Sequence, residues 1–198
     1  MSPPSSETRP TSDRLRETLF NILAPRIEDA RFLDLCAGTG AVGIEALSRG
    51  AAQVTFVDQS REMCALVEAN LEPLKVDQDE IEIVTAEAFE FLRRCERNLN
   101  EPPLSTTPRG LLARGPRLVG LLARSRLYDI IFFDPPYAAD YEFVLDYLGE
   151  HAPVLLAEAG VFIVEHDKKK KLREEAGQLK CYRVIKQGDS SLSFYQST

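Results

Sequence analysis

The sequence predicts one α/β domain built on a mostly parallel, doubly wound sheet with an antiparallel edge near the C-terminus. Three observations support this prediction. Short apolar segments alternate with amphipathic ones, turns containing glycine or proline separate many of them, and the last two strand-like segments flank a tight turn. At 198 residues, the chain has the length of a single domain with a full core.

The expected elements alternate between strand and helix along the chain. The expected strands are 32–36, 53–57, 81–85, 128–133 and 160–165, followed by a closing pair at 181–186 and 191–196 around the turn 187–190. The expected helices are a first one spanning Leu15 to Leu23, then 41–48, 61–71, 88–94 and 141–148. Thr11 or Ser12 is the expected N-cap of the first helix, and Pro25 is its expected stop.

Composition excludes several classes of protein. No apolar run approaches the roughly 20 residues that cross a bilayer, and Met1 to Pro10 is polar, so we expect a cytoplasmic protein without a membrane contact. The four cysteines are scattered without CxxC spacing, and the two histidines lie far apart. We therefore expect reduced cysteines, no metal site and no histidine-based triad.

Charge is distributed unevenly on this acidic chain. The formal net charge is −7, but the stretch from Arg93 to Arg126 carries eight arginines and only two acidic residues. A basic patch on an acidic body can dock phosphates. Lys168 to Lys171 form a second basic cluster, which we interpret as a solvated surface turn in preference to a binding site.

A glycine motif marks the candidate cofactor site. Gly38 to Gly43 matches GxGxxG between a strand and a helix, and Asp58 ends the next strand, which is the context of a dinucleotide-binding fold. Asp34, however, lies inside the first strand, where its carboxylate would repel a pyrophosphate. It suits the cationic amino-acid tail of S-adenosyl-L-methionine, while Asp58 would accept the ribose hydroxyls. The expected cofactor-binding residues here are Asp34, Ala37, Gly38, Thr39, Gly40 and Asp58.

Glu87 and Phe89, which follow the third strand, each have a functional and a structural interpretation. Glu87 is the candidate for the adenine of the cofactor, and the alternative is an acidic residue that favours the start of its helix. Phe89 is expected in the core rather than beneath the adenine.

The turn Asp134-Pro135-Pro136-Tyr137 follows the apolar strand 128–133 and supplies the candidate catalytic residues. A carboxylate and a backbone carbonyl can accept the two N–H bonds of a planar amino group, while the tyrosine ring stacks on the attached base. Neither proline has a backbone N–H that would repel that amino group. We interpret the chain as a methyltransferase for an exocyclic base nitrogen, and the alternative is a purely structural turn after a buried strand.

Several segments together resemble the RsmD-type methyltransferases of bacteria. They are Arg9-Pro10-Thr11-Ser12-Asp13-Arg14 with Arg16-Glu17 and Phe20-Asn21, Leu33 to Gly40, Glu45-Ala46-Leu47-Ser48-Arg49-Gly50-Ala51, Phe133-Asp134-Pro135-Pro136-Tyr137, and Gly188-Asp189 with Leu192-Ser193-Phe194-Tyr195. The resemblance covers nearly the whole chain outside 98–126. It implies a Rossmann-like, seven-stranded class I fold and methylation of N2 of a guanine in small-subunit (16S) ribosomal RNA. It also implies that Thr11 lies near the cofactor and target pocket. The expected partner is this RNA or the small-subunit particle, and we expect a monomer.

The chain departs from the family pattern at three places. Only eight residues precede Arg9, where the family has a basic hairpin, and Glu87 stands where aspartate is common. The third departure is an arginine-, proline- and glycine-rich insertion at 98–126. We expect this insertion to be mobile, and the alternative is an ordered arm that contacts RNA.

Other functions remain open from the sequence. The target could be N6 of an adenine in DNA, because the Asp-Pro-Pro-Tyr turn is shared with such enzymes. A non-catalytic protein that binds S-adenosylmethionine or RNA is a second alternative, and an NAD-dependent dehydrogenase is a third.

Overall fold

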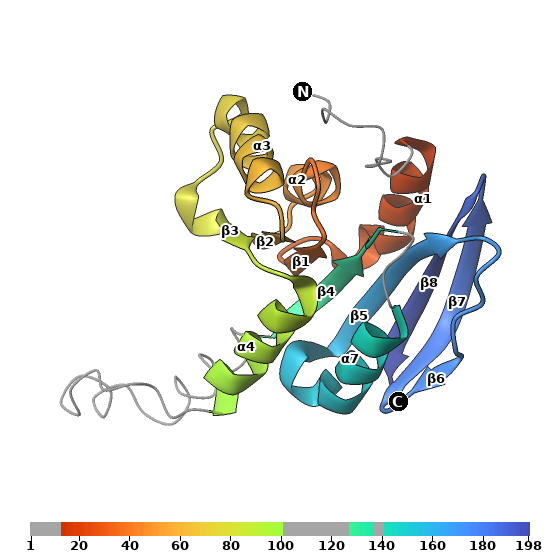
Figure 1. Ribbon diagram of the computed structural model, residues 1–198. Helices are drawn as coiled ribbons and strands as arrows, with labels where there is room; N and C mark the ends of the chain where they lie inside the picture. Colours follow the sequence, from red (N-terminus) through yellow and green to blue (C-terminus); the bar gives the residue numbers. More distant parts are fainter. Residues whose placement is uncertain (1–12, 101–126, 137–140) are drawn as a thin grey trace.

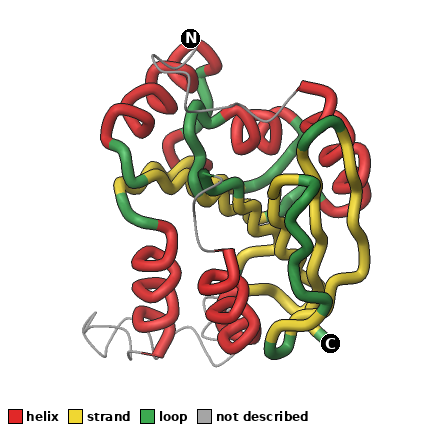
Figure 2. The backbone as a smooth tube through the Cα atoms, turned by 45° about the vertical axis from the view of Figure 1, so that its right-hand side comes forward, coloured by secondary structure: helices red, strands yellow, loops and turns green. Residues whose placement is uncertain are grey.

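A single eight-stranded sheet forms the centre of the computed structural model, which describes residues 13–100, 127–136 and 141–198 (Figures 1 and 2). The strand order is β3-β2-β1-β4-β5-β8-β7-β6. The first five strands in this order are parallel, and β8, β7 and β6 are antiparallel to their neighbours. The strands are β1 (Arg31–Leu35), β2 (Gln53–Asp58), β3 (Ile81–Thr85), β4 (Tyr128–Phe133), β5 (Leu156–Asp167), β6 (Glu175–Ala176), β7 (Leu179–Gln187) and β8 (Ser190–Ser197).

Helices cover both faces of this sheet. The helices are α1 (Asp13–Leu23), α2 (Ala41–Ser48), α3 (Arg61–Leu71), α4 (Ala88–Asn100) and α7 (Tyr141–Leu155), with short 3₁₀ turns at Ala24–Arg26, Glu72–Leu74 and Gln78–Glu80. The residues of α1, α2 and α3 share one core cluster with one face of the sheet, and those of α4 and α7 share a second cluster with the other. The arrangement is therefore a three-layer, doubly wound α/β fold, as predicted.

The central strands are apolar on both faces because both faces are covered. Phe32 and Leu33 are neighbours in β1, yet Phe32 packs under α1 and α2 while Leu33 packs under α4 and α7. In β4, Phe132 packs on the same face of the sheet as Phe32, and its neighbour Phe133 packs on the face of Leu33. A near-continuous apolar run is what a buried parallel strand requires, since successive side chains point to opposite faces.

Most predicted elements are confirmed, and the differences have local causes. Helix α4 runs to Asn100 instead of 94, and so takes in the first three residues of the predicted insertion. Helix α7 continues past Gly149 to Leu155, where the sequence suggested a stop at 148. Gly149 lets β6 approach α7 closely, because a Cβ on Gly149 would lie 2.1 Å from the carbonyl oxygen of Ala176. Residues 101–126 of the insertion lie outside the described residues, so its mobility stays a prediction.

The antiparallel edge holds one strand more than expected. The seven strands of the predicted architecture are β1 to β5, β7 and β8, and the two-residue β6 pairs with β7 beyond them. Strand β5 also begins at Leu156, four residues before the predicted start. None of the described helices is long and apolar enough to cross a membrane.

Candidate active site

Four carboxylates converge at the edge of the sheet where the parallel strands end. Asp34 lies in β1, Asp58 ends β2, Glu87 follows β3 and Asp134 follows β4. Burial and then the negative charges of Asp58, Asp134, Asp34 and Glu87 raise the pKa of the Cys36 thiol well above its usual value. Strand ends of a doubly wound sheet are the usual position of a ligand site.

The loop between β1 and α2 is wound tightly across this edge. Cys36, Gly38 and Gly40 all have positive φ, at 65°, 55° and 76°, a region that only glycine enters without strain. The Ala37 N–H donates to the Val57 carbonyl at 2.9 Å, and the Gly40 N–H donates to the Ala37 carbonyl at 2.8 Å. These bonds hold the loop against the end of β2. No signal in the sequence indicates that Cys36 shares the left-handed conformation.

Asp58 fixes the glycine loop to the next strand. Its Oδ2 accepts the Gly38 N–H at 2.9 Å, and its Oδ1 accepts the Ser60 N–H at 2.8 Å. From α3, the Asn70 side-chain amide donates to the Thr39 carbonyl at 3.0 Å, a contact that sequence reasoning missed. The loop is therefore preorganised by side chains of two neighbouring elements.

Asp34 lies beneath the loop, with only 2% of its surface exposed. Its Oδ2 accepts the N–H of Gly43 at 2.9 Å. Burial raises the pKa of Asp34 to about 7; the Gly43 hydrogen bond opposes this rise, and the charge of Asp58 adds to it. Gly43 is required at this point, because a Cβ there would lie 2.3 Å from the Phe56 ring. The structure thus gives Asp34 a contact with the first turn of α2 that the sequence did not predict.

Glu87 lies at the start of α4, as the alternative interpretation of this residue expects. Its Oε2 accepts the Glu90 N–H at 3.0 Å in the first turn of α4. The preceding Ala86 N–H donates to the Asp58 carbonyl at 3.0 Å. The exposed Glu87 side chain therefore lies beside the end of β2, and its adenine contact stays a prediction.

The Asp134 turn is bonded to the end of β1, where the glycine loop begins. The Asp134 N–H donates to the carbonyl of Leu35, the last residue of β1, at 3.3 Å. Pro135 is buried and Pro136 is exposed. Of the predicted site residues, Tyr137 and Thr11 lie outside the described residues, so their positions stay predictions.

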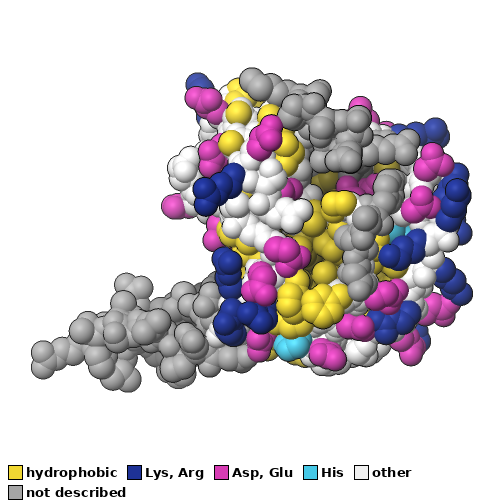
Figure 3. Space-filling model, viewed as in Figure 1, with side chains coloured by type: hydrophobic (Ala, Val, Ile, Leu, Met, Phe, Trp, Pro, Cys, Tyr) yellow, Lys and Arg dark blue, Asp and Glu magenta, His cyan; other side chains and the backbone are white. Residues whose placement is uncertain are grey.

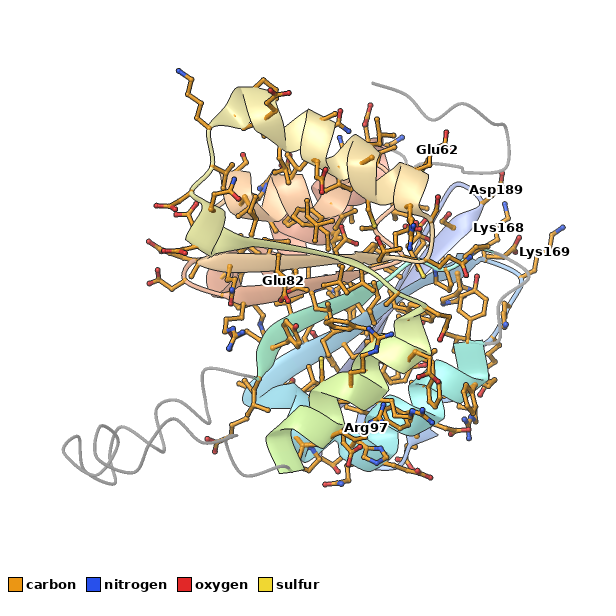
Figure 4. All side chains as sticks on the ribbon, turned by 60° about the vertical axis from the view of Figure 1, so that its left-hand side comes forward. Glu62, Glu82, Arg97, Lys168, Lys169 and Asp189 are labelled. Atoms are coloured by element: carbon orange, nitrogen blue, oxygen red, sulfur yellow. The ribbon has the colours of Figure 1, made fainter. Side chains whose placement is uncertain are left out.

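The basic turn 168–171 lies at the same edge, after β5. Lys168 pairs with Asp189 at 2.8 Å, and Lys170 lies 3.8 Å from the ring centre of Tyr141, the first residue of α7. Figure 4 shows Lys168, Lys169 and Asp189 on the same side as Glu62, in the first turn of α3, and Glu82 near the start of β3 on the opposite side.

These contacts decide which class of cofactor fits. In a dinucleotide site, backbone N–H groups of the glycine loop face a pyrophosphate. Here the N–H groups of Gly38 and Gly43 are already donated to carboxylates. A Cβ on Gly38 would meet nothing within 4 Å among the described residues, so the loop is open toward them at that point. Open space beside several carboxylates suits a cationic ligand without phosphates, and S-adenosylmethionine has that character. Among the described residues, no group of three or more His, Cys, Asp or Glu is placed to hold a metal ion.

Comparison with known proteins gives the same assignment. The family model described as Conserved hypothetical protein 95 matches residues 1–103 and 114–196. The chain belongs to this family. Its members include proteins named ribosomal RNA small subunit methyltransferase D, so the resemblance to the RsmD-type methyltransferases is confirmed.

Individual relatives agree with this membership. YlbH of Bacillus subtilis (strain 168) is 31% identical over 192 residues, which cover 96% of this chain and 89% of that protein. Ribosomal RNA small subunit methyltransferase D of Escherichia coli (strain K12) is 48% identical over 90 residues, covering 46% of this chain and 44% of that protein. The solved structure of yhhF from Escherichia coli superposes with a TM-score of 0.70 at 30% identity, covering 98% of this chain and 90% of that one. The predicted Rossmann-like methyltransferase fold is thus confirmed.

Proposed function

We propose that this protein transfers the methyl group of S-adenosylmethionine to N2 of a guanine in small-subunit ribosomal RNA. The observation that carries the proposal is the hydrogen bond from the Asp134 N–H to the Leu35 carbonyl, at 3.3 Å. This bond holds the turn that we propose to bind the amino group against the end of β1, where the cofactor loop begins. Relatives in Haemophilus influenzae and Escherichia coli bear the name ribosomal RNA small subunit methyltransferase D, which supports the choice of RNA.

S-adenosylmethionine supplies a methyl group on a sulfonium, ready for in-line transfer. In our proposal the open face of Gly38, with Ala37, Thr39 and Gly40 beside it, receives the amino-acid tail of the cofactor. The negative charge of Asp34 beneath the loop attracts the ammonium group of that tail, and Asp58 accepts the ribose hydroxyls through lone pairs that its two backbone bonds leave available. The exposed Glu87 carboxylate is positioned to accept the adenine amino group, and the family resemblance adds Thr11 to this pocket.

Asp134 and Pro135 act on the nitrogen that receives the methyl group. A base amino nitrogen is a weak nucleophile, since its lone pair is delocalised into the ring. If its two N–H groups are accepted by the Asp134 carboxylate and the Pro135 carbonyl, the nitrogen becomes more tetrahedral and its lone pair points at the methyl group. As the N–C bond forms and the S–C bond breaks, the nitrogen would release one proton, for which the Asp134 carboxylate is the adjacent acceptor. Pro136 shapes the turn, and Tyr137 stacks on the base. The rate enhancement then comes from positioning and electrostatics.

The target base has to leave its stack to reach this pocket. An exocyclic amino group inside a duplex is paired, so the substrate is an unpaired or flipped-out nucleotide. Small-subunit RNA, free or assembled into its particle, offers such nucleotides in loops.

The test is methyl transfer from labelled S-adenosylmethionine to three acceptors: small-subunit particles from a strain lacking this gene, the RNA extracted from them, and chromosomal DNA from the same strain. We expect label in at least one of the ribosomal acceptors and none in DNA. Label in DNA alone would replace this proposal with a DNA methyltransferase. Bound cofactor with no label in any acceptor would indicate a non-catalytic protein.

A further inference from the structure

A row of four aromatic rings lies on the molecular surface between α4 and α7. Phe143, Tyr147 and His151 follow one another at four-residue intervals along α7, and Phe89 faces them from α4. The ring centres are 4.3 Å apart for Phe89 and Phe143, 4.9 Å for Phe89 and Tyr147, and 4.2 Å for Tyr147 and His151. We call these four residues the aromatic row. Figure 3 shows exposed hydrophobic side chains gathered over α4 and α7, with Lys and Arg groups beside them.

The aromatic row starts beside the candidate active site. Phe89 lies in the first turn of α4, two residues after Glu87. Phe143 lies in the first turn of α7, the helix that follows the Asp134 turn in the chain. Both helices begin at the edge where the parallel strands end, so the row extends from the active-site edge along the two helices (Figure 1).

Phe143, the first residue of the aromatic row on α7, is half-exposed, which core packing does not explain. Phe143 retains 53% of its surface, whereas Tyr141, two residues earlier on the same helix, retains 2%. Phe89, Tyr147 and His151 are partly buried. One face of a large ring therefore stays available next to the site, supported from behind by Phe89.

Arginines continue the α4 side of the row. Arg93 and Arg97 follow Phe89 at intervals of four and eight residues, so they lie on the same face of α4. Both are exposed. Burial and then Glu96 raise the pKa of Tyr147, and the positive charges of Arg93 and Arg97 oppose this rise. Arg93 pairs with Glu90 at 3.3 Å, while no ion pair of Arg97 occurs among the described residues. Figure 4 shows Arg97 on the part of α4 farthest from Lys168 and Lys169.

We infer that the aromatic row binds a single-stranded segment of the RNA substrate next to the target nucleotide. A base stacks on the exposed face of Phe143, and Arg97, with Arg93, contacts the phosphates that follow. Stacking on aromatic rings beside basic groups is the usual way in which single strands are held, because every base has a π-face. The inference deepens the proposed function, on which it rests for the identity of the RNA.

The test uses a single-stranded RNA oligonucleotide that carries 2-aminopurine, whose fluorescence is quenched when it stacks on a ring. The Phe143→Ala variant should bind this probe about five- to fiftyfold more weakly than the wild type and lose most of the quenching. Phe143→Tyr should retain both, while Phe143→Leu, which keeps apolar bulk without a π-face, should lose the quenching. Leu74→Ala is the matched control, because Leu74 is 52% exposed and lies beyond α3, toward the opposite edge.

Arg97→Gln tests the phosphate contact separately. It should reduce the slope of log affinity against log salt by about 0.7, the value for one phosphate contact on a single strand. Phe143→Ala should leave that slope unchanged. Lys75→Gln removes the same charge from an exposed residue next to Leu74 and should change neither the slope nor the affinity.

Two results would overturn the inference: wild-type affinity and quenching in Phe143→Ala, or weaker binding of S-adenosylmethionine by that variant, which would make Phe143 part of the cofactor pocket. The assay does not depend on methyl transfer. A wild-type protein that quenches the probe but methylates no RNA would therefore refute the proposed function and leave the aromatic row intact.

Discussion

Gly38 donates its backbone N–H to the Asp58 carboxylate at 2.9 Å, so the cofactor loop is tied to the end of the neighbouring strand. The same carboxylate accepts the Ser60 N–H at 2.8 Å and thereby fixes the start of α3. A glycine loop of this sequence can also bind phosphates through its backbone N–H groups. Which ligand it suits depends on whether these N–H groups are free or already donated within the protein. In this protein the Gly38 N–H donates to the Asp58 side chain and the Gly40 N–H to the Ala37 carbonyl, which favours a ligand without phosphates.

Asp58→Asn should therefore weaken the binding of S-adenosylmethionine. The amide has one acceptor oxygen, so it cannot accept both backbone N–H groups, and its NH₂ faces one of them. Loss of a hydrogen bond to a charged group predicts about a 10- to 100-fold higher Kd, measured by calorimetry, and a lower Tm. Asp77→Asn is the control, since Asp77 also accepts a backbone N–H, from Asp79 at 3.2 Å, in a 3₁₀ turn before β3. Equal Kd values for Asp58→Asn and the wild type would contradict this account of the loop.

Asp34→Asn should change how stability depends on pH. Burial raises the pKa of Asp34 from 3.8 to about 7, so between these values the folded protein holds a proton that the unfolded chain releases. This group therefore lowers stability as pH rises from about 4 to 7. Asparagine keeps an acceptor for Gly43 and carries no charge. The free energy of unfolding of the variant should therefore rise relative to that of the wild type across this range, by on the order of 3–4 kcal/mol at pH 8. Urea unfolding at pH 5 and pH 8 measures the difference.

The same substitution should weaken cofactor binding at pH 8, because it removes the charge proposed to attract the ammonium group. A stability difference between the two proteins that stays constant from pH 4 to pH 8 would show that Asp34 is not the titrating group.

Gly43→Ala should destabilise the protein through one contact. The added Cβ would lie 2.3 Å from the Phe56 ring, and overpacking of this kind costs about 1–3 kcal/mol. Combining it with Phe56→Leu should recover part of that loss, beyond the sum of the two single effects, in a double-mutant cycle of unfolding free energies. Gly188→Ala is the comparison, because a Cβ there meets no described residue within 4 Å and the φ of 62° alone opposes the change. Additive effects of Gly43→Ala and Phe56→Leu would refute the contact.

Asp134→Asn should separate chemistry from cofactor binding. The amide presents an NH₂ where an acceptor is required, so kcat should fall at least about 100-fold, as when one preorganised transition-state contact is lost. The Kd for S-adenosylmethionine should change by less than about threefold. Asp129→Asn is the control in the same strand, because Asp129 accepts the Arg31 N–H at 2.8 Å at the opposite end of β4. A parallel loss of binding and turnover in Asp134→Asn would contradict the division of roles.

The convergence of the acidic residues could be predicted from the sequence because topology alone ensures it. Asp58 and Asp134 follow apolar strands, and parallel strands end at the same edge of a sheet. The Asp34–Gly43 hydrogen bond could not be predicted, since it depends on the path of the loop. The hydrogen bond from the Asn70 side chain to the Thr39 carbonyl could not be predicted for a similar reason. An asparagine on a surface helix carries no signal of its distant partner.

Helix lengths and the surface between helices were the weaker part of the prediction. Gly149 has the usual signature of a helix end, but it is there because β6 approaches α7 too closely for a side chain. Phe89 was expected in the core, and in the structure it is only partly buried against α7, within the aromatic row. Its partners come from a helix more than 50 residues away, and sequence spacing cannot show which two helices face each other.

The identity of the methylated nucleoside tests the central claim most directly. Small-subunit RNA from a strain lacking this gene is treated with the purified protein and labelled S-adenosylmethionine, digested to nucleosides and separated by chromatography. We expect the label to elute as N2-methylguanosine and the Asp134→Asn variant to produce none. Label in N6-methyladenosine, or an Asp134→Asn variant as active as the wild type, would contradict it.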